Sequence, residues 1–502
     1  MIINRSEYVD KVLGCWMGKN IGGTLGAPFE WHRQTNNVSF YTQELGGSPL
    51  PNDDLDIQLL WLIALEEQGV ELDAKLLGEY WMLYVTPHWS EYGNAKSNMK
   101  AGLMPPLSGT VDNPFKDSCG SYIRSEIWAC IAPGCPERAA RYAYEDAVID
   151  HGSGEGTYAE VFMAALESAA FVEKDLQKLI DIALSYIPAE CGVARAVRHV
   201  RECRRQGMTW VQAREELLMH FRGELFSWAR ISPEDEAKGF REGKLGWDVP
   251  GNIGLTLVGL LYGEGDLERT VCIAVNCGED TDCTAATAGA VLGILNGLSS
   301  LPARWIEPIG ERIVTACLNL GELGSYGHQL PKDIRQLTER VERVAERVID
   351  RFRLPVTIAD GPTDIPDDIA VSLMARPEFL ELYDCLRGPV YEFDFYRVYV
   401  DYGDGPTLRK NEPKTIRLLF ENKYKISERL LINWYTPDQA QVLPDRRKSV
   451  FLPHGWYLGG RTEVEFQLEA AEVQQVNRFV VEVTVDGRHT VMLVPIVLLN
   501  GH

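Results

Sequence analysis

Residues 277–284 read Cys-Gly-Glu-Asp-Thr-Asp-Cys-Thr, and residues 284–295 continue with Thr-Ala-Ala-Thr-Ala-Gly-Ala-Val-Leu-Gly-Ile-Leu. The second part has the length of a helix and consists largely of small side chains, which allow a helix to lie close against its neighbours. Acidic residues gather at its start, where they complement the helix dipole. We therefore expect a central helix of a bundle that begins with the carboxylates of Asp280 and Asp282.

A second acidic group, Pro51-Asn52-Asp53-Asp54-Leu55-Asp56, precedes another long apolar run that ends at Gln68. Such a group can cap a helix, or it can bind a hard cation through oxygen ligands. Alone it supports both interpretations equally. Asp56 either supports the ligands from outside the cluster or is a helix-start charge, and we favour the helix-start charge. Two acidic helix starts that meet in space would form a pocket that is costly without a metal ion. Together the two groups favour a metal centre that could activate water.

The segment Gly18–Glu30 is rich in glycine, which permits close approach of the backbone to other groups. It lacks the GxGxxG pattern and follows no expected strand, so a dinucleotide-binding fold is not indicated. His151 stands before the loop Gly-Ser-Gly-Glu-Gly at residues 152–156. A lone histidine beside such a loop is more typical of a structural role than of a catalytic one.

The periodicity of apolar residues changes along the chain. Apolar residues recur every three or four positions before residue 353, as in the amphipathic run from Ile334 to Val348, and every two positions after Val390. Turn signals such as Asp486-Gly487 separate the later runs. We predict a helical domain over residues 1–353, a linker with a short helical piece over 354–389, and a small antiparallel β-sandwich over 390–502. The aromatic residues of the last part are interpreted as its core: Tyr396, Tyr399, Tyr402, Trp434 and Trp456.

The chain has 502 residues and a formal net charge of −22. An acidic surface repels phosphate backbones and anionic lipid, so we expect neither nucleic-acid nor membrane binding. The N-terminal residues show no signal-peptide pattern, and no stretch reaches the ~20 apolar residues that span a bilayer. The eleven cysteines lack CxxC pairs and are interpreted as buried thiols of a cytoplasmic protein.

Taken together, the glycine segment ending in Glu30, the Asn-Asp-Asp group and the Gly-Glu-Asp-Thr-Asp group resemble the ADP-ribosylglycohydrolase family. That family includes the dinitrogenase reductase-activating glycohydrolases, and the resemblance covers about residues 8–320. It implies an all-α domain that holds two Mg²⁺ or Mn²⁺ ions. The metal ligands that it implies are Asn52, Asp53, Asp54, Asp280, Asp282 and Cys283. The catalytic residues that it implies are Glu30 and Asp54, and the substrate-binding residues are Gly120, Ser121 and His151.

This sequence departs from the family pattern where Asn52 and Cys283 replace two hydroxyl ligands and where Tyr122 replaces the second glycine of the phosphate-contacting loop. An amide oxygen still suits a hard cation, whereas a thiol favours a softer metal or turns away.

We therefore expect a metal-dependent glycohydrolase that cleaves an N- or O-glycosidic bond of an ADP-ribosyl or related ribosyl substrate. The alternatives are a non-catalytic protein that binds an ADP-ribose-like ligand through the retained metals, and a protein whose metals are purely structural. The C-terminal domain is expected either to shape the pocket entrance or to mediate association between copies, and we favour the second role.

Overall fold

The computed structural model describes residues 1–221, 230–231, 233, 237, 248–318, 330–456 and 459–501. Contacts divide the chain into two compact units. One is helical and comprises Met1–Asn94 and Asn113–Leu380, and the other is rich in β-structure and comprises Ala95–Asp112 and Glu381–His502. The prediction of a helical part followed by a β-rich part is confirmed, but an internal segment of the first part belongs to the second unit.

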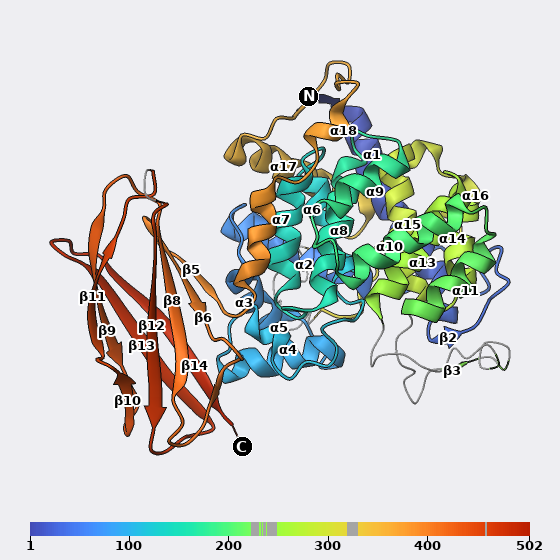
Figure 1. The fold of residues 1–502 in the computed structure, drawn as a ribbon. Helices are drawn as coiled ribbons and strands as arrows, with labels where there is room; N and C mark the ends of the chain where they lie inside the picture. Colours follow the sequence, from blue (N-terminus) through green and yellow to red (C-terminus); the bar gives the residue numbers. More distant parts are fainter. Residues whose placement is uncertain are drawn as a thin grey trace. The chain divides into compact units, whose positions relative to one another are not determined.

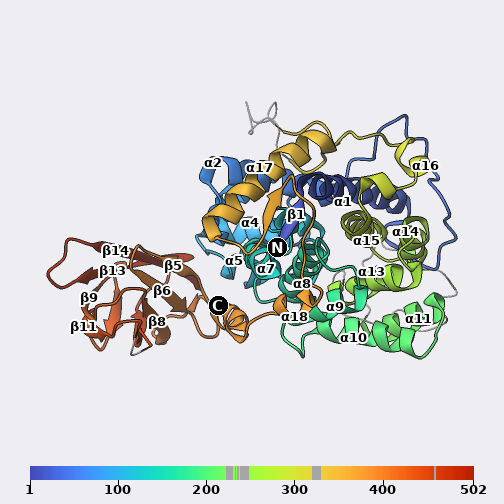
Figure 2. The ribbon, with the colours of Figure 1, turned by 90° about the horizontal axis from the view of Figure 1, so that it is seen from above.

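At the centre of the helical unit, α1 (Arg5–Gly26) lies against α15 (Thr281–Asn296), as Figures 1 and 2 show. Their backbones touch along a seam of small residues. A β-carbon added to Gly18 would lie 2.0 Å from the carbonyl oxygen of Gly289, and one added to Gly22 would lie 2.1 Å from that of Ala285. Because real β-carbons do not approach so closely, glycine is required there, and the seam fixes the start of α15 beside the end of α1.

The other helices of this unit follow the expected periodicities. Helix α17 (Ile334–Phe352) buries one apolar stripe and exposes the opposite face, as its sequence predicts. Helix α2 (Asp53–Gln68) is buried over most of its length. The remaining helices of four or more residues in the described part of this unit are α3 (Ala74–Tyr84), α6 (Glu126–Ile131), α7 (Pro136–Ala147), α8 (Glu155–Ala169), α9 (Leu176–Leu184), α10 (Gly192–Arg205), α11 (Trp210–Phe221), α13 (Val249–Gly263), α14 (Leu267–Asn276), α16 (Ala303–Ile306) and α18 (Ile369–Ser372).

Short strands and turns complete the helical unit. Strand β1 (Ile2–Asn4) pairs in parallel with β4 (Thr357–Ala359), and β2 (His32–Arg33) pairs in parallel with β3 (Arg230–Ile231). The 3-10 turns are η1 (Ala27–Phe29), η2 (Tyr122–Arg124) and η3 (Leu298–Ser300), and η5 (Pro377–Cys385) lies where the two units meet in the sequence. The expected linker over residues 354–389 therefore carries β4, α18 and η5.

The β-rich unit contains two five-stranded sheets. One has the strand order β10 (Ala440–Leu443), β12 (Arg461–Ala470), β8 (Lys414–Asn422), β6 (Tyr396–Asp401), β5 (Val390–Glu392) and is antiparallel. The other has the order β11 (Arg447–Leu452), β9 (Glu428–Tyr435), β13 (Val476–Val485), β14 (Val491–Asn500), β7 (Thr407–Leu408), and its β14–β7 pair is parallel. The second sheet is therefore mixed, which differs from the purely antiparallel expectation.

Inward side chains of both sheets form one core, in which the rings of Trp434 and Phe466 lie 5.1 Å apart. Tyr396, Tyr399 and Tyr402 are buried as expected, whereas Trp456 is 80% exposed and belongs to no core. Leu103 and Leu107 join this core from the internal segment, which carries α5 (Leu107–Thr110) and the end of α4 (Ser90–Ala101).

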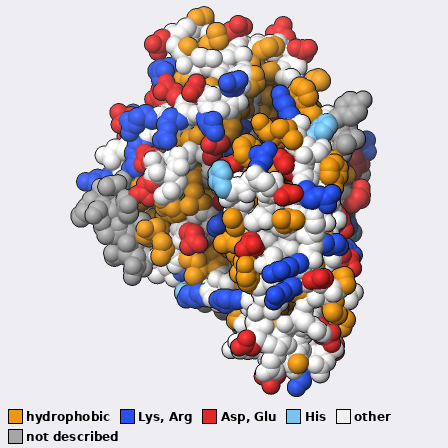
Figure 3. Space-filling model, turned by 90° about the vertical axis from the view of Figure 1, so that its left-hand side faces the viewer, with side chains coloured by type: hydrophobic (Ala, Val, Ile, Leu, Met, Phe, Trp, Pro, Cys, Tyr) orange, Lys and Arg blue, Asp and Glu red, His pale blue; other side chains and the backbone are white. Residues whose placement is uncertain are grey.

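The charged side chains and the thiols are distributed as follows. On the face shown in Figure 3, Lys and Arg side chains lie among Asp and Glu rather than in one basic area. Among the described helices, none is both long and apolar enough to cross a bilayer. All eleven cysteines are free thiols, and only Cys385 is partly exposed.

Candidate metal centre

The starts of α2 and α15 meet, although 226 residues separate Asp54 from Asp280 in the sequence. The Cys283 thiol donates to Oδ1 of Asp54 over 3.5 Å. One ligand atom each from Asp54, Asp282 and Cys283 lie within 4.8 Å of one another, and the same holds for Glu30, Asp280 and Asp282. The structure thus gathers residues from the ends of three helical segments around one small space.

Local backbone features place these side chains. The Asn52 carboxamide oxygen accepts from the Asp54 backbone N–H over 2.8 Å and caps α2. Before α15 the chain turns through Gly278 and Glu279, both with positive φ (74° and 67°). A β-carbon on Gly278 would lie 2.2 Å from the Gln34 carbonyl oxygen, so this turn needs glycine. Glu279 leaves the cluster and pairs with Arg33 over 3.0 Å.

A cavity of about 710 Å³ opens onto the cluster. Its acidic wall includes Glu30, Asp53, Asp280 and Asp282, and its backbone wall includes Gly120 and the pair Ala316 and Cys317. Its aromatic wall consists of Trp31, Trp89, Tyr92 and Phe115. The described residues that line it include no Lys or Arg. Such a cavity has the size of a small-molecule site and carries strong negative charge at one end.

Several carboxylate oxygens of the cluster lack a hydrogen-bond partner. Oδ2 of Asp54, Oδ1 of Asp280 and Oδ1 of Asp282 are buried without a hydrogen-bond partner. Burial raises the pKa of Asp280 to about 6. Burial and the charges of Asp282 and Asp280 raise the pKa of Glu30 to about 11. Oxygen atoms of this kind are the ligands that Mg²⁺ and Mn²⁺ take, so the residues present fit such ions.

The thiol of Cys283 does not turn away from this cluster. It is buried among the carboxylates, and burial together with the charges of Asp280 and Asp282 raises its pKa well above the ordinary value. A thiol beside carboxylates makes the centre softer than an all-oxygen site. Asn52 keeps its amide oxygen engaged in capping, so its part in the cluster is first to hold Asp54 in place.

Lys19 is a member of the site that the motifs did not reveal. It lies on α1, is 2% exposed, and its ammonium group is 2.6 Å from Oε1 of Glu126 and 3.8 Å from Oδ2 of Asp54. The Gln58 amide donates to the backbone oxygen of Asp54 and to Oε2 of Glu126, each over 2.8 Å. A lysine within a glycine-rich helical segment was the available signal.

Of the two roles considered for Asp56, the contacts favour that of a residue which supports the site from outside the cluster. Its side chain is fully buried, and its Oδ2 accepts from the backbone N–H groups of Ala316, over 2.6 Å, and Cys317. Both of these residues line the cavity. Asp56, which belongs to α2, therefore fixes one wall of the site by binding residues that are distant in sequence.

Of the three expected substrate-binding residues, Gly120 lines the cavity, whereas Ser121 and His151 are buried and bind other protein groups. Gly120 lines the cavity, and a β-carbon on it would lie 1.9 Å from Oε1 of Glu91. Ser121 is fully buried and donates to the Gly156 carbonyl over 2.7 Å. His151 is fully buried, with Nδ1 3.0 Å from Asp150 and Nε2 3.3 Å from the Ser118 hydroxyl.

Arg124 and Glu91 lie beside Gly120. Arg124 is buried and paired with Asp146 over 2.9 Å and with Asp150 over 2.7 Å, so protein carboxylates occupy its guanidinium group. Glu91 lines the cavity, and burial raises its pKa to about 7. The motifs gave no indication of Glu91, which belongs to a helix without a recognisable pattern.

Known proteins were compared with this chain. No curated protein matched. A FixG-related protein from Vibrio parahaemolyticus was found with a TM-score of 0.18 and 9% identity, covering 22% of this chain and 100% of that one. The DNA glycosylase AlkC from Pseudomonas fluorescens was found with a TM-score of 0.15 and 13% identity, covering 90% and 100%. Likenesses this weak carry no argument. The family model for ADP-ribosylglycohydrolase matches residues 4–352, which include both acidic helix starts, and the chain belongs to this family.

Proposed function

We propose that this member of the family is a glycohydrolase that depends on divalent metal and cleaves the bond between a ribosyl group and its leaving group. One observation carries the proposal. Carboxylate oxygens of Asp54, Asp280 and Asp282 are buried without hydrogen-bond partners beside a cavity that can hold a small molecule. A site of this kind is costly unless cations occupy it.

Asp53, Asp54, Asp280 and Asp282 would hold two ions of Mg²⁺ or Mn²⁺, with Cys283 at the edge of the site. When bound, such ions polarise substrate hydroxyl groups and lower the pKa of water. The chain itself orients the ligands. Asn52 caps the helix that carries Asp53 and Asp54, while Lys19 lies beside the Asp54 carboxylate and Gln58 donates to the Asp54 backbone oxygen.

Glu30 is the residue to which we assign proton transfer. Its carboxyl group lines the cavity next to Asp280 and Asp282, and in the metal-free protein burial and the charges of these aspartates raise its pKa. A protonated carboxyl group in this position can donate to the leaving group as the glycosidic bond breaks. Asp54 is assigned the complementary role: as an ionised carboxylate it would stay on the side of the site from which water attacks.

The cavity wall indicates which part of a substrate would enter. The aromatic side chains can pack against a sugar or a base, whereas the described lining residues offer no cationic side chain for a diphosphate. We therefore favour recognition through the ribosyl group and place any phosphate groups toward solvent. The alternative function, ligand binding without catalysis, would keep the same ions and the same pocket.

We assign different roles to the two units. We assign the chemistry to the helical unit, because the described residues around the cluster all belong to it. The two sheets of the β-rich unit share one core, which is how a β-sandwich is built, and we assign this unit an accessory role such as association between copies.

The test is an assay of the full-length protein with ADP-ribosylated peptides, ADP-ribose derivatives and nucleosides, in Mn²⁺, in Mg²⁺ and in EDTA. We expect release of ribose or ADP-ribose from at least one substrate, and no release in EDTA. Asp282→Asn should abolish turnover, whereas the matched change Asp367→Asn, at an exposed residue, should not. Binding of ADP-ribose without turnover of any substrate would favour the non-catalytic alternative.

A further inference from the structure

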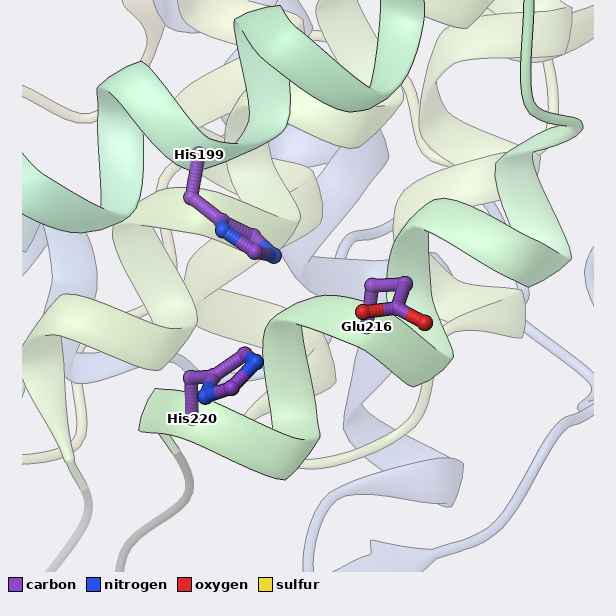
Figure 4. Close-up of side chains that lie close together, drawn as sticks. All are labelled: His199, Glu216 and His220. Atoms are coloured by element: carbon purple, nitrogen blue, oxygen red, sulfur yellow. The ribbon is translucent and has the colours of Figure 1, made fainter. Parts of the chain in front are cut away.

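A second group of metal-binding side chains lies elsewhere in the helical unit. His199 belongs to α10, and Glu216 and His220 lie four residues apart on α11. One ligand atom from each lies within 4.8 Å of the other two. Figure 4 shows the two imidazole rings and the carboxylate turned toward a common space between the helices.

The chemistry of these ligands differs from that of the carboxylate cluster. The rings of His199 and His220 are 5.2 Å apart between centroids, and Nε2 of His199 is buried without a hydrogen-bond partner. A neutral imidazole with an unpartnered nitrogen is ready to bind a metal ion.

The ligand types argue against a hard cation. Arg195 and Arg198 line the same small pocket as the two histidines, and Glu216 is the acidic member of the ligand group. Mg²⁺ and Ca²⁺ bind through several oxygen ligands, whereas this group offers one carboxylate. Zn²⁺ and related ions bind imidazole strongly, so a group of two histidines and one glutamate suits them.

We infer that His199, Glu216 and His220 form a site for a divalent transition-metal ion, with Zn²⁺ as the best fit, separate from the carboxylate cluster. Three protein ligands leave one position of a tetrahedral ion for water or an external ligand. The nitrogen and oxygen ligands of such an ion lie roughly 3.3 Å apart, given metal–ligand distances of about 2.0–2.1 Å. Side-chain rotation of Glu216 and His220, which are exposed, can close the gap from the observed spacing.

The site would join α10 to α11. The two helices are connected by a short turn at residues 206–209, and the ion would add a link between the middle of α10 and the second half of α11. A metal ion that binds only the folded protein raises its stability in proportion to the logarithm of the ion concentration. Zinc should therefore stabilise this helix pair without taking part in glycoside cleavage.

The experiment is equilibrium dialysis of the full-length protein against buffered Zn²⁺, with excess Mg²⁺ present to compete for the carboxylate cluster. The wild type should bind one more equivalent of Zn²⁺ than His220→Gln, or bind that equivalent roughly 100-fold more tightly, because a ligand is lost. Glu215→Gln removes a neighbouring carboxylate of the same helix and should bind zinc like the wild type. The copper-loaded wild type should show nitrogen hyperfine splitting in electron paramagnetic resonance that is weakened in His220→Gln.

Two further readouts keep the inference separate from the proposed glycohydrolase. His220 is exposed, so His220→Gln should fold normally and keep any turnover of the wild type. Zinc should raise the melting temperature of the wild type and of Glu215→Gln but not that of His220→Gln. Equal zinc stoichiometry and affinity in the wild type, His199→Gln and His220→Gln would overturn the inference, whatever the glycohydrolase assay shows.

Discussion

Replacing Lys19 with methionine tests whether this lysine balances the buried carboxylates of the metal centre. The ammonium group of Lys19 is 2.6 Å from Glu126 and 3.8 Å from Asp54, and both carboxyl groups are essentially inaccessible to water. Removing one partner of a buried ion pair costs about 3–5 kcal/mol, because a buried charge is left without compensation. The Gln58 amide still donates to Glu126, so we expect the free energy of unfolding to fall by about 3 kcal/mol.

The matched control is Lys11→Met on the same helix. Lys11 is also buried, at 5% exposure, but its ammonium group donates to the Phe171 carbonyl over 2.8 Å, and its acidic neighbour Glu7 is partly exposed. Losing a bond to a neutral carbonyl of this kind should cost only about 1–2 kcal/mol. The two variants therefore remove similar side chains from one helix and differ in the charge that remains behind.

The assay is urea unfolding in EDTA, followed by far-ultraviolet circular dichroism, which reports the helical unit. Lys19→Met combined with Glu126→Gln should regain part of the lost stability, because the second change removes the uncompensated charge. Added Mn²⁺ should stabilise Lys19→Met more than the wild type, since its cluster carries one more uncompensated charge. Equal losses in Lys19→Met and Lys11→Met, or no recovery in the double variant, would refute this account of Lys19.

Three further changes test other parts of the site. Glu30→Gln should lower turnover by about 10²–10⁴-fold and leave Mn²⁺ affinity nearly unchanged, as steady-state kinetics and metal titration can show; unchanged turnover would remove Glu30 from the mechanism. Cys283→Thr should shift the metal preference from Mn²⁺ toward Mg²⁺, measured as the ratio of activities, because a hydroxyl suits a hard cation better than a thiol. Burial raises the pKa of Glu91 from 4.5 to about 7, so the folded protein holds a proton there that the unfolded chain has lost, and stability falls as pH rises between these values. Glu91→Gln should remove roughly 3 kcal/mol of that fall, measured by urea unfolding at pH 4.5 and pH 7.

The positions of the main site residues follow from local patterns that can be read in the sequence. Both acidic groups start helices because carboxylates and amides favour helix N-termini, and the small residues of α15 allow its start to lie against α1. What joins the two groups is the glycine seam, whose partners are about 270 residues apart. The resemblance to a family supplied that pairing, which no periodicity could have supplied.

Two features were beyond such reasoning. Lys19 and Asp56 bind groups that lie close only after folding, Glu126 for the first and the 316–317 segment for the second. Leu103 and Leu107 have an ordinary apolar pattern, yet they join the core of the β-rich unit, whose strands begin almost 300 residues later. A pattern shows that a side chain will be buried, but it does not show which distant element will cover it.

The charge balance of the cluster connects its folding with its activity. Lys19 is shared between Asp54 and Glu126, and the remaining carboxyl groups face one another, so protons must supply the missing positive charge when metal is absent. The raised pKa values of Glu30 and Asp280 mean that these groups hold protons more strongly than free carboxyl groups do. A divalent ion that enters the cluster replaces the protons of the aspartates that bind it, so metal binding and release of these protons are one event. Metal affinity must then rise with pH until the aspartates are ionised. The buried carboxylates that destabilise the metal-free protein are therefore the groups that bind the ions tightly.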